Sequence, residues 1–174
     1  MRDLKDVIKI QYSNCRTLIY YDTKGNKFEL GCSAFKSMVK YIQDVASKDE
    51  AGGVLLGRYI LNSKHVVVDT ITVPSNHDQR LRHFFFRSAK KHQIIIDNFW
   101  LSSDGTCNYL GEWHTHPESD PVPSSRDISE WQRKLQADKY DSDCLFYVIV
   151  GTRKINAWKG LREGGILEKL KQFY

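Results

Sequence analysis

The stretch GEWHTHPESDPVPSSRD, residues 111–127, places two histidines one residue apart and follows them with a proline. The segment 108–116 around them reads as a β-strand. Side chains at positions i and i+2 of a strand point to the same face, so we expect the imidazoles of His114 and His116 side by side, close enough to share one metal ion. Pro117 cannot continue a strand's hydrogen bonding and is expected to end it.

The same stretch ends in Ser-x-x-Asp, at the start of a helix predicted over 126–137. Residues three apart at a helix start are neighbours on its surface, so Ser124 and Asp127 are expected to face the same way. If this end of the helix faces the end of the strand, Asp127 becomes a third metal ligand and Ser124 stands beside the metal. Two histidines and one carboxylate are typical of a catalytic zinc site, because they leave the fourth position to water.

A simpler interpretation of His-x-His is a solvated or hydrogen-bonded pair without a metal. The adjacent Pro117 and the spaced Ser-x-x-Asp argue against it. Structural zinc sites usually fill all four positions with cysteine and histidine, and residues 111–127 contain no cysteine. The pattern therefore predicts a hydrolase site with one zinc ion.

The order His-Thr-His-Pro, a seven-residue gap after His116 and then Ser-x-x-Asp resembles the JAMM motif of the JAB/MPN+ zinc metalloproteases. That family also has an upstream glutamate in the pattern Glu-x-x-Gly-x-Leu-x-Gly, and EAGGVLLG at 50–57 is similar to it. The resemblance covers most of the chain. It implies one JAB/MPN-type domain over 1–174, of the α/β (α+β) class, with a curved, mostly antiparallel sheet flanked by helices.

The resemblance also implies a role for each site residue. His114, His116 and Asp127 would bind one Zn²⁺ per chain. Glu50 would deprotonate the attacking water and pass the proton to the leaving amine. Ser124 would hydrogen-bond the oxyanion that develops on the substrate. The chain would then be an active metalloprotease rather than an inactive scaffold member, because Glu50 is present.

Glu112 is a rival for the role of base. It lies two residues before His114 and therefore shares the histidine face of the strand. Two residues along an extended strand correspond to about 7 Å, which would put Glu112 further from the metal than the histidines are. We favour Glu50, and the simpler interpretation of Glu112 is a surface carboxylate or one that supports the ligands from behind.

The flanking residues GEWHTHPE and PVPS resemble bacterial JAMM proteins of integrative elements and anti-phage islands, such as the deconjugating peptidases of CBASS operons. This resemblance implies a protein substrate, the C-terminal tail of a ubiquitin-like modifier or of a cGAS-like nucleotidyltransferase and its conjugates, cut just after that C-terminus. Two alternatives stay open. One is a JAMM-fold peptidase for another precursor, such as a sulfur carrier or a phage-tail protein. The other is a non-catalytic nucleic-acid-binding module.

Residues 74–90 are irregular, basic and aromatic, and in the JAMM family the comparable region is an insertion that grips the ubiquitin-like partner. The partner contacts are expected to include side chains of Phe84, Phe85 and Phe86. The simpler interpretation is that at least two of these rings belong to the core. A docking role is expected for Arg80, Arg82 and Arg87. The dense basic patch over 80–92 is also the feature that a nucleic-acid-binding module would use.

The remaining sequence predicts intermixed helices and strands. Strands are expected within 17–30, 51–61, 65–73, 143–160 and 164–174. Helices are expected over 33–47, with Ser33 as N-cap, and over 88–103, where three consecutive isoleucines leave a strand open. The other histidines have no ligand-type spacing: His65, His77, His83 and His92.

Composition bounds the class of protein. The 174 residues carry a net charge of +5 with 41% hydrophobic residues, which suits a globular domain. No apolar run approaches the roughly 20 residues of a membrane helix, and residues 1–12 lack the apolar region of a secretory signal. A cytoplasmic protein without membrane contact is therefore expected. Its four cysteines are expected to be reduced thiols: Cys15, Cys32, Cys107 and Cys144.

Overall fold

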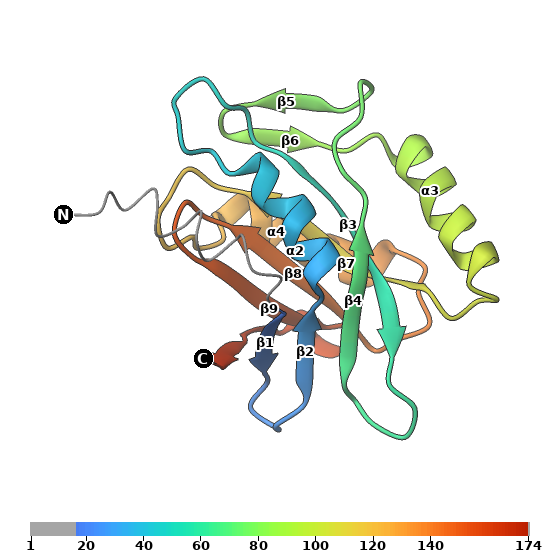
Figure 1. Ribbon diagram of the computed structural model, residues 1–174. Helices are drawn as coiled ribbons and strands as arrows, with labels where there is room; N and C mark the ends of the chain where they lie inside the picture. Colours follow the sequence, from blue (N-terminus) through green and yellow to red (C-terminus); the bar gives the residue numbers. More distant parts are fainter. Residues whose placement is uncertain (1–16, 174) are drawn as a thin grey trace.

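The computed structural model describes residues 17–173. The expectations for residues 1–12, Cys15 and Tyr174 lie outside this range. A strongly curved sheet carries helix α2 on one face and helices α3 and α4 on the other (Figure 1). The helices are α2 (Cys32–Met38), α3 (Ala89–Ser102) and α4 (Ser125–Ala137), with 3₁₀ turns η1 (Val39–Tyr41) and η2 (Glu163–Gly165). Within 17–173, no helix is both long and apolar enough to cross a membrane.

The main sheet has nine strands in the order β10-β9-β8-β7-β3-β4-β2-β1-β11. Two neighbouring pairs, β2–β4 and β7–β8, are parallel, and all others are antiparallel. This confirms the predicted curved, mostly antiparallel sheet. Its strands are β1 (Leu18–Tyr21), β2 (Lys27–Leu30), β3 (Gly52–Tyr59), β4 (Val66–Ile71), β7 (Asn108–Thr115), β8 (Cys144–Val150), β9 (Ile155–Leu161), β10 (Leu167–Lys169) and β11 (Lys171–Phe173).

The two edges of this sheet come from one short segment of chain. The single terminal strand predicted within 164–174 is divided, because Leu170 alone separates β10 at one edge from β11 at the other. The sheet must curl to bring its edges that close. Contacts between strands near the two edges stabilise this curvature. The Tyr20 hydroxyl of β1 donates to the Ile155 carbonyl of β9 at 2.7 Å. Lys159 likewise pairs with Asp22 at 2.8 Å.

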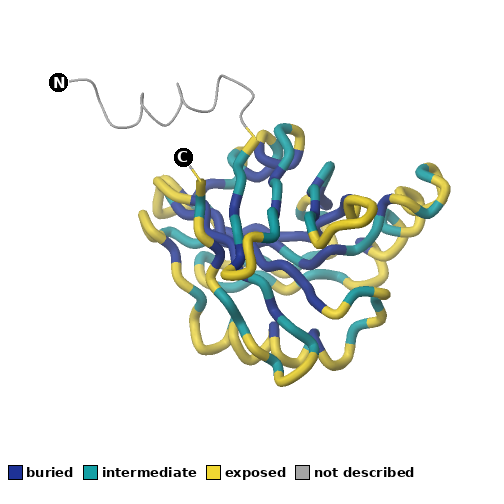
Figure 2. The backbone as a smooth tube through the Cα atoms, turned by 90° about the horizontal axis from the view of Figure 1, so that it is seen from below, coloured by how far each residue is buried: buried dark blue, intermediate teal, exposed yellow. Residues whose placement is uncertain are grey.

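The core lies on both faces of the central strands. All seven residues of β8 are buried, because alternate side chains meet opposite helices. Phe146, Val148 and Val150 join the α2 cluster, and Leu145, Tyr147 and Ile149 pack with Trp131 and Leu135 of α4. Figure 2 shows that the buried residues are concentrated in the sheet. The sequence of a strand that is covered on both faces is a continuous apolar run, and CLFYVIV at 144–150 is such a run.

Helix α2 is shorter than the predicted span 33–47, and its N-cap is Gly31 rather than Ser33. The helical path ends with η1, so residues 42–47 are not helical. Two backbone carbonyls of that segment accept hydrogen bonds from the Arg82 guanidinium, at 2.9 and 3.0 Å. The buried Gln43 side chain donates to the Arg82 carbonyl at 2.7 Å. These tertiary contacts override the helical periodicity of the sequence.

Residues 74–90 are more regular than predicted. They contain a small hairpin, β5 (Gln79–Leu81) and β6 (Phe84–Phe86), which forms a separate two-stranded sheet. Helix α3 follows at once, so the alternative of a strand over the isoleucines is wrong. His92 fixes this helix to the main sheet, because its fully buried ring contacts the Thr72 hydroxyl at 2.6 Å and the Asp78 carboxylate at 3.0 Å.

The cysteines divide into two kinds. Cys107 and Cys144 are free and buried, in agreement with the prediction of structural thiols. Cys32 is disulfide-bonded, so the prediction of a reduced thiol is wrong for this residue. Its position at the start of α2 gave no signal for either state.

Candidate metal centre

The two histidines lie where β7 ends. This strand is held on both sides, by β3 with His114 opposite Gly52 and by β8 with His114 opposite Ile149. The backbone N–H of His116 continues the ladder to the Val150 carbonyl at 3.0 Å. The Nε2 atoms of His114 and His116 are 3.0 Å apart. The predicted pair of neighbouring imidazoles is therefore present, and a rigid sheet positions it.

Asp127 lies in the first turn of α4 and faces both imidazoles. Its Oδ1 is 3.4 Å from Nε2 of His114, and its Oδ2 is 3.5 Å from Nε2 of His116. Burial alone would raise the pKa of Asp127, but hydrogen bonding to the two histidines outweighs it and holds the pKa well below its ordinary value. The carboxylate is thus ionised and available to a cation.

Ser124 is the N-cap of α4. Its Oγ accepts from the Asp127 backbone N–H at 3.2 Å and donates to the Asp127 carboxylate at 2.6 Å. The backbone N–H of Ser124 donates to the same carboxylate oxygen at 2.7 Å. These bonds form a reciprocal capping box. The Ser-x-x-Asp spacing therefore orients the Asp127 carboxylate as well as starting the helix.

Glu50 completes the cluster from the segment that leads into β3. Its carboxylate lies within 4.8 Å of the ligand atoms of His114 and His116. The backbone is fixed on both sides, because the Glu50 N–H donates to the Leu81 carbonyl and its carbonyl accepts from Arg80, both at 2.9 Å. Burial raises the pKa of Glu50. A raised pKa makes a carboxylate a stronger base, which suits a group that takes up a proton and later releases it.

These donor atoms fit a zinc ion. Tetrahedral ligands at 2.0 to 2.1 Å from zinc lie roughly 3.3 Å from one another. The Nε2 atoms of His114 and His116 are 3.0 Å apart, and one oxygen of the Asp127 carboxylate lies 3.4 Å from the first while the other oxygen lies 3.5 Å from the second. Glu50 lies within 4.8 Å of the same histidine atoms. Two carboxylates, those of Asp127 and Glu50, are therefore near enough to serve as the third ligand.

The loop between the histidines and Asp127 is fastened to the turn between β8 and β9. The buried Asn156 amide donates to the Pro121 carbonyl and to the Asp120 carboxylate, both at 2.8 Å. Backbone N–H groups of that turn donate to the carbonyls of Glu118 and Ser119, at 2.7 to 3.2 Å. The distance from the strand end to α4 is set by these contacts. Sequence reasoning missed Asn156, because 35 residues separate it from Pro121.

The family model for prokaryotic homologs of the JAB domain matches residues 34–161. The chain belongs to this JAB-domain family. The matched span contains every residue of the metal centre described above. The recognition of a JAB-type domain from the sequence is therefore confirmed.

Curated relatives named "CD-NTase/cGAS isopeptidase" match most of the chain. A Pseudomonas aeruginosa protein is 41% identical over 68% of this chain and 73% of its own length. An Escherichia coli protein is 31% identical over 91% of this chain and 97% of its own length. A Vibrio cholerae protein is 35% identical over 71% and 74%. A solution structure from Desulfitobacterium hafniense has the same fold, with a TM-score of 0.53 at 20% identity over 78% of this chain and 84% of its own.

A groove of about 510 Å³ runs through this JAB domain from the metal centre between β6 and α4. All three phenylalanines of β6 line it, and none is fully buried, so the interpretation that two of them are core is wrong. The hairpin rests directly on β3, because a Cβ at Gly52 would lie 2.7 Å from the Phe85 ring. The insertion is thus one wall of the groove.

The predicted docking arginines have internal roles. Arg80 donates to the backbone carbonyls of Asp49 and Glu50, and Arg82 donates to the loop that follows α2. Arg87 pairs with Glu112 at 2.5 Å. Their guanidinium groups hold the hairpin against the body of the domain, and a docking role for them stays a prediction. Replacing all three would disturb the Glu50 backbone as well as any docking surface.

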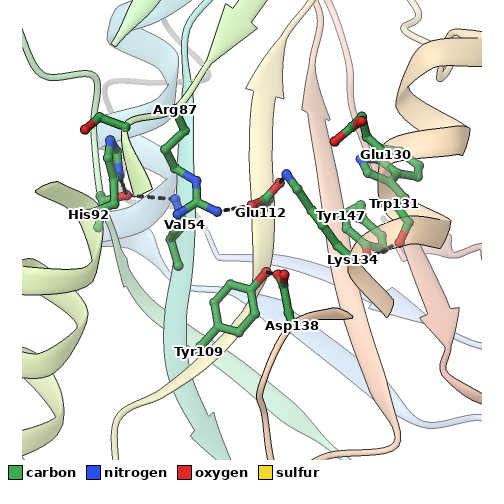
Figure 3. A network of polar contacts seen from close by, with 12 residues as sticks. Val54, Arg87, His92, Tyr109, Glu112, Glu130, Trp131, Lys134, Asp138 and Tyr147 are labelled. Carbon is green, nitrogen blue, oxygen red and sulfur yellow. Dashed lines mark hydrogen bonds and ion pairs between the residues drawn. The ribbon is translucent and has the colours of Figure 1, made fainter. Parts of the chain in front are cut away.

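Glu112 is committed to a partly buried ion network at the floor of the groove (Figure 3). Its carboxylate pairs with Arg87 and with Lys134 of α4. Burial alone would raise the pKa of Glu112, but the charges of Lys134 and Arg87 outweigh it and bring the pKa to about 2. A carboxylate bound by two cations at neutral pH is a poor base, which favours Glu50 for that role.

Proposed function

We propose that the chain is a zinc-dependent isopeptidase. It cleaves just after the C-terminal tail of a cGAS-like nucleotidyltransferase or ubiquitin-like modifier and so reverses the conjugation of that protein to its targets in CBASS anti-phage defence. The observation that carries the proposal is the convergence of Glu50 with the His114, His116 and Asp127 donor atoms at one end of an open groove. The name shared by the curated relatives supports the substrate.

The proposed reaction divides the work between metal and protein. Zinc held by His114, His116 and Asp127 would supply a Lewis acid and lower the pKa of water to about 7. Glu50 takes the proton from the attacking water and delivers it to the leaving amine, for which its raised pKa is suited. Its buried position next to the histidines keeps the transfer short.

Ser124 is proposed to stabilise the oxyanion of the substrate. Its hydroxyl donates to Asp127 in the structure and has to turn toward the substrate for this role. The backbone N–H of Ser124 keeps its own bond to the Asp127 carboxylate at 2.7 Å. The aspartate therefore stays oriented when the hydroxyl turns away.

The groove has the form that an extended peptide tail requires. It is open, the residues of the metal centre are part of its lining, and the β6 phenylalanines and α4 form its walls. A nucleic-acid-binding role has less support, because the arginines of the basic patch are engaged with backbone carbonyls and Glu112. Phosphate binding needs cations that are free to contact it.

A conjugate assay tests this proposal. The zinc-loaded protein, incubated with a nucleotidyltransferase joined through its C-terminus to a target lysine, is expected to release nucleotidyltransferase with an intact C-terminus, as measured by intact-protein mass spectrometry. A chelator should stop the release and added zinc should restore it. A conjugate of an unrelated protein is the matched control and should stay intact. Release that continues in chelator, or no release from any conjugate, would contradict the proposal.

A further inference from the structure

One contact crosses the groove beside the metal centre. The guanidinium of Arg126, in the first turn of α4, lies over the Phe84 ring of β6 with Cζ 4.5 Å from the ring centroid. Arg126 directly precedes Asp127 in the chain. Phe84, Arg126 and Asp127 all line the groove. A substrate tail held in this groove would therefore lie close to this pair.

Arg126 differs from the other arginine and lysine side chains that line the groove. Arg87 and Lys134 both pair with Glu112, and Arg133 pairs with Glu130 at 2.9 Å. Within residues 17–173, Arg126 makes no hydrogen bond or ion pair, and it is exposed. It is therefore the groove cation that is free to bind a ligand.

The chemistry of this pair indicates what it would bind. A guanidinium over an aromatic face keeps its in-plane N–H donors available, and the ring reduces its freedom to move. Two of those donors match the two oxygens of a carboxylate. The neighbouring groove residues include Glu118 and Glu130, which would repel a polyanion such as nucleic acid. A single carboxylate is therefore a better match than a phosphate chain.

We propose that Arg126, supported by Phe84, is a specificity-determining residue that binds an acidic side chain of the substrate close to the cleaved bond. This inference rests on the proposed isopeptidase function and names a property of its substrate tail. Arg126 binds the Asp or Glu side chain of the tail, while Glu50 and the proposed metal ligands carry out cleavage. Tails without an acidic residue at the matching position are bound more weakly.

Paired peptides test the inference. Fluorogenic peptides carry one Glu, moved through the three positions on either side of the cleaved bond, and each has a counterpart with Gln. The wild-type protein is expected to prefer Glu to Gln at one position by about tenfold in kcat/KM, as charge-assisted bonding implies. Arg126→Gln should remove the preference, Arg126→Lys should keep part of it, and Arg126→Glu should favour Lys at that position. Arg133→Gln, the matched control on the same helix, should keep the preference.

A binding measurement separates this inference from the proposed function. The same peptides, titrated into the Glu50→Gln variant and followed by fluorescence anisotropy, should show the Glu preference before any appreciable cleavage takes place. If the wild-type protein cleaves nothing but the variant retains an Arg126-dependent preference, the proposed function fails and the inference stands. A wild-type protein that distinguishes Glu from Gln at no position, or a preference that survives Arg126→Gln, would overturn the inference.

Discussion

Replacing Glu50 by glutamine is expected to lower kcat/KM for a conjugate by about 10³-fold, within the range of general acid–base contributions. Glutamine keeps the size of the side chain but cannot accept the proton of the attacking water or return it to the leaving amine. The Glu50 backbone is held by Leu81 and Arg80, so the substitution should leave the surrounding structure in place. Gel-based measurements of the cleavage rate of one purified conjugate give the ratio of kcat/KM between the wild type and the variant.

The control for this variant is its neighbour Asp49, which is exposed. Asp49→Asn removes one carboxylate next to Glu50 and should change the rate little. Circular dichroism of both variants should match the wild type. A Glu50→Gln protein that cleaves the conjugate at the wild-type rate would show that Glu50 is not the base.

The Glu112→Gln variant is expected to lose about 3 kcal/mol of unfolding free energy, as when one partner of a buried ion pair is removed. Arg87 and Lys134 would keep their charges, with side chains only 19% and 18% exposed, and lose the carboxylate that neutralises them. Urea denaturation at neutral pH measures the loss. Glu130→Gln, which breaks the exposed pair with Arg133, is the control and should cost less than about 1 kcal/mol. Equal losses in both variants would contradict the buried network.

The pH dependence of this loss has a defined sign. The pKa of Glu112 falls from its ordinary 4.5 to about 2 in the folded protein. A group with a lowered folded-state pKa contributes stability that is fully present above its unfolded value and disappears as the pH falls through its folded value. The stability difference between wild type and Glu112→Gln should therefore shrink between pH 4.5 and pH 2. A constant difference over that interval would show that the charge is not its source.

The local half of this site could be predicted from sequence because its geometry depends on short spacings. His114 and His116 share a face by strand periodicity, and Ser124 and Asp127 are joined by a capping box three residues long. Strand and helix geometry fix such relations without knowledge of the fold. Glu50 could be added only from the family pattern, because it lies far along the chain from His114 and no local geometry relates the two residues.

The remaining half depends on contacts between distant segments. The sequence favours a surface or supporting carboxylate for Glu112 over a base, but it does not reveal the two partners of Glu112, because they lie 25 and 22 residues away. The sequence did not indicate that the Arg82 guanidinium donates to backbone carbonyls 36 and 37 residues earlier. The same bonds ended the helix that periodicity extended to residue 47. Sequence periodicity records which face of an element is apolar, and it does not record which distant group a long polar side chain reaches.

The zinc content of three purified proteins tests the central claim most directly. We expect elemental analysis to find about one zinc per chain in the wild type and in Glu50→Gln, and almost none in Asp127→Asn, because His114, His116 and Asp127 form the ligand set while Glu50 stands beside it. A wild-type protein that binds no zinc would contradict the account. So would a Glu50→Gln protein that loses the metal while Asp127→Asn retains it, since Glu50 would then be the third ligand.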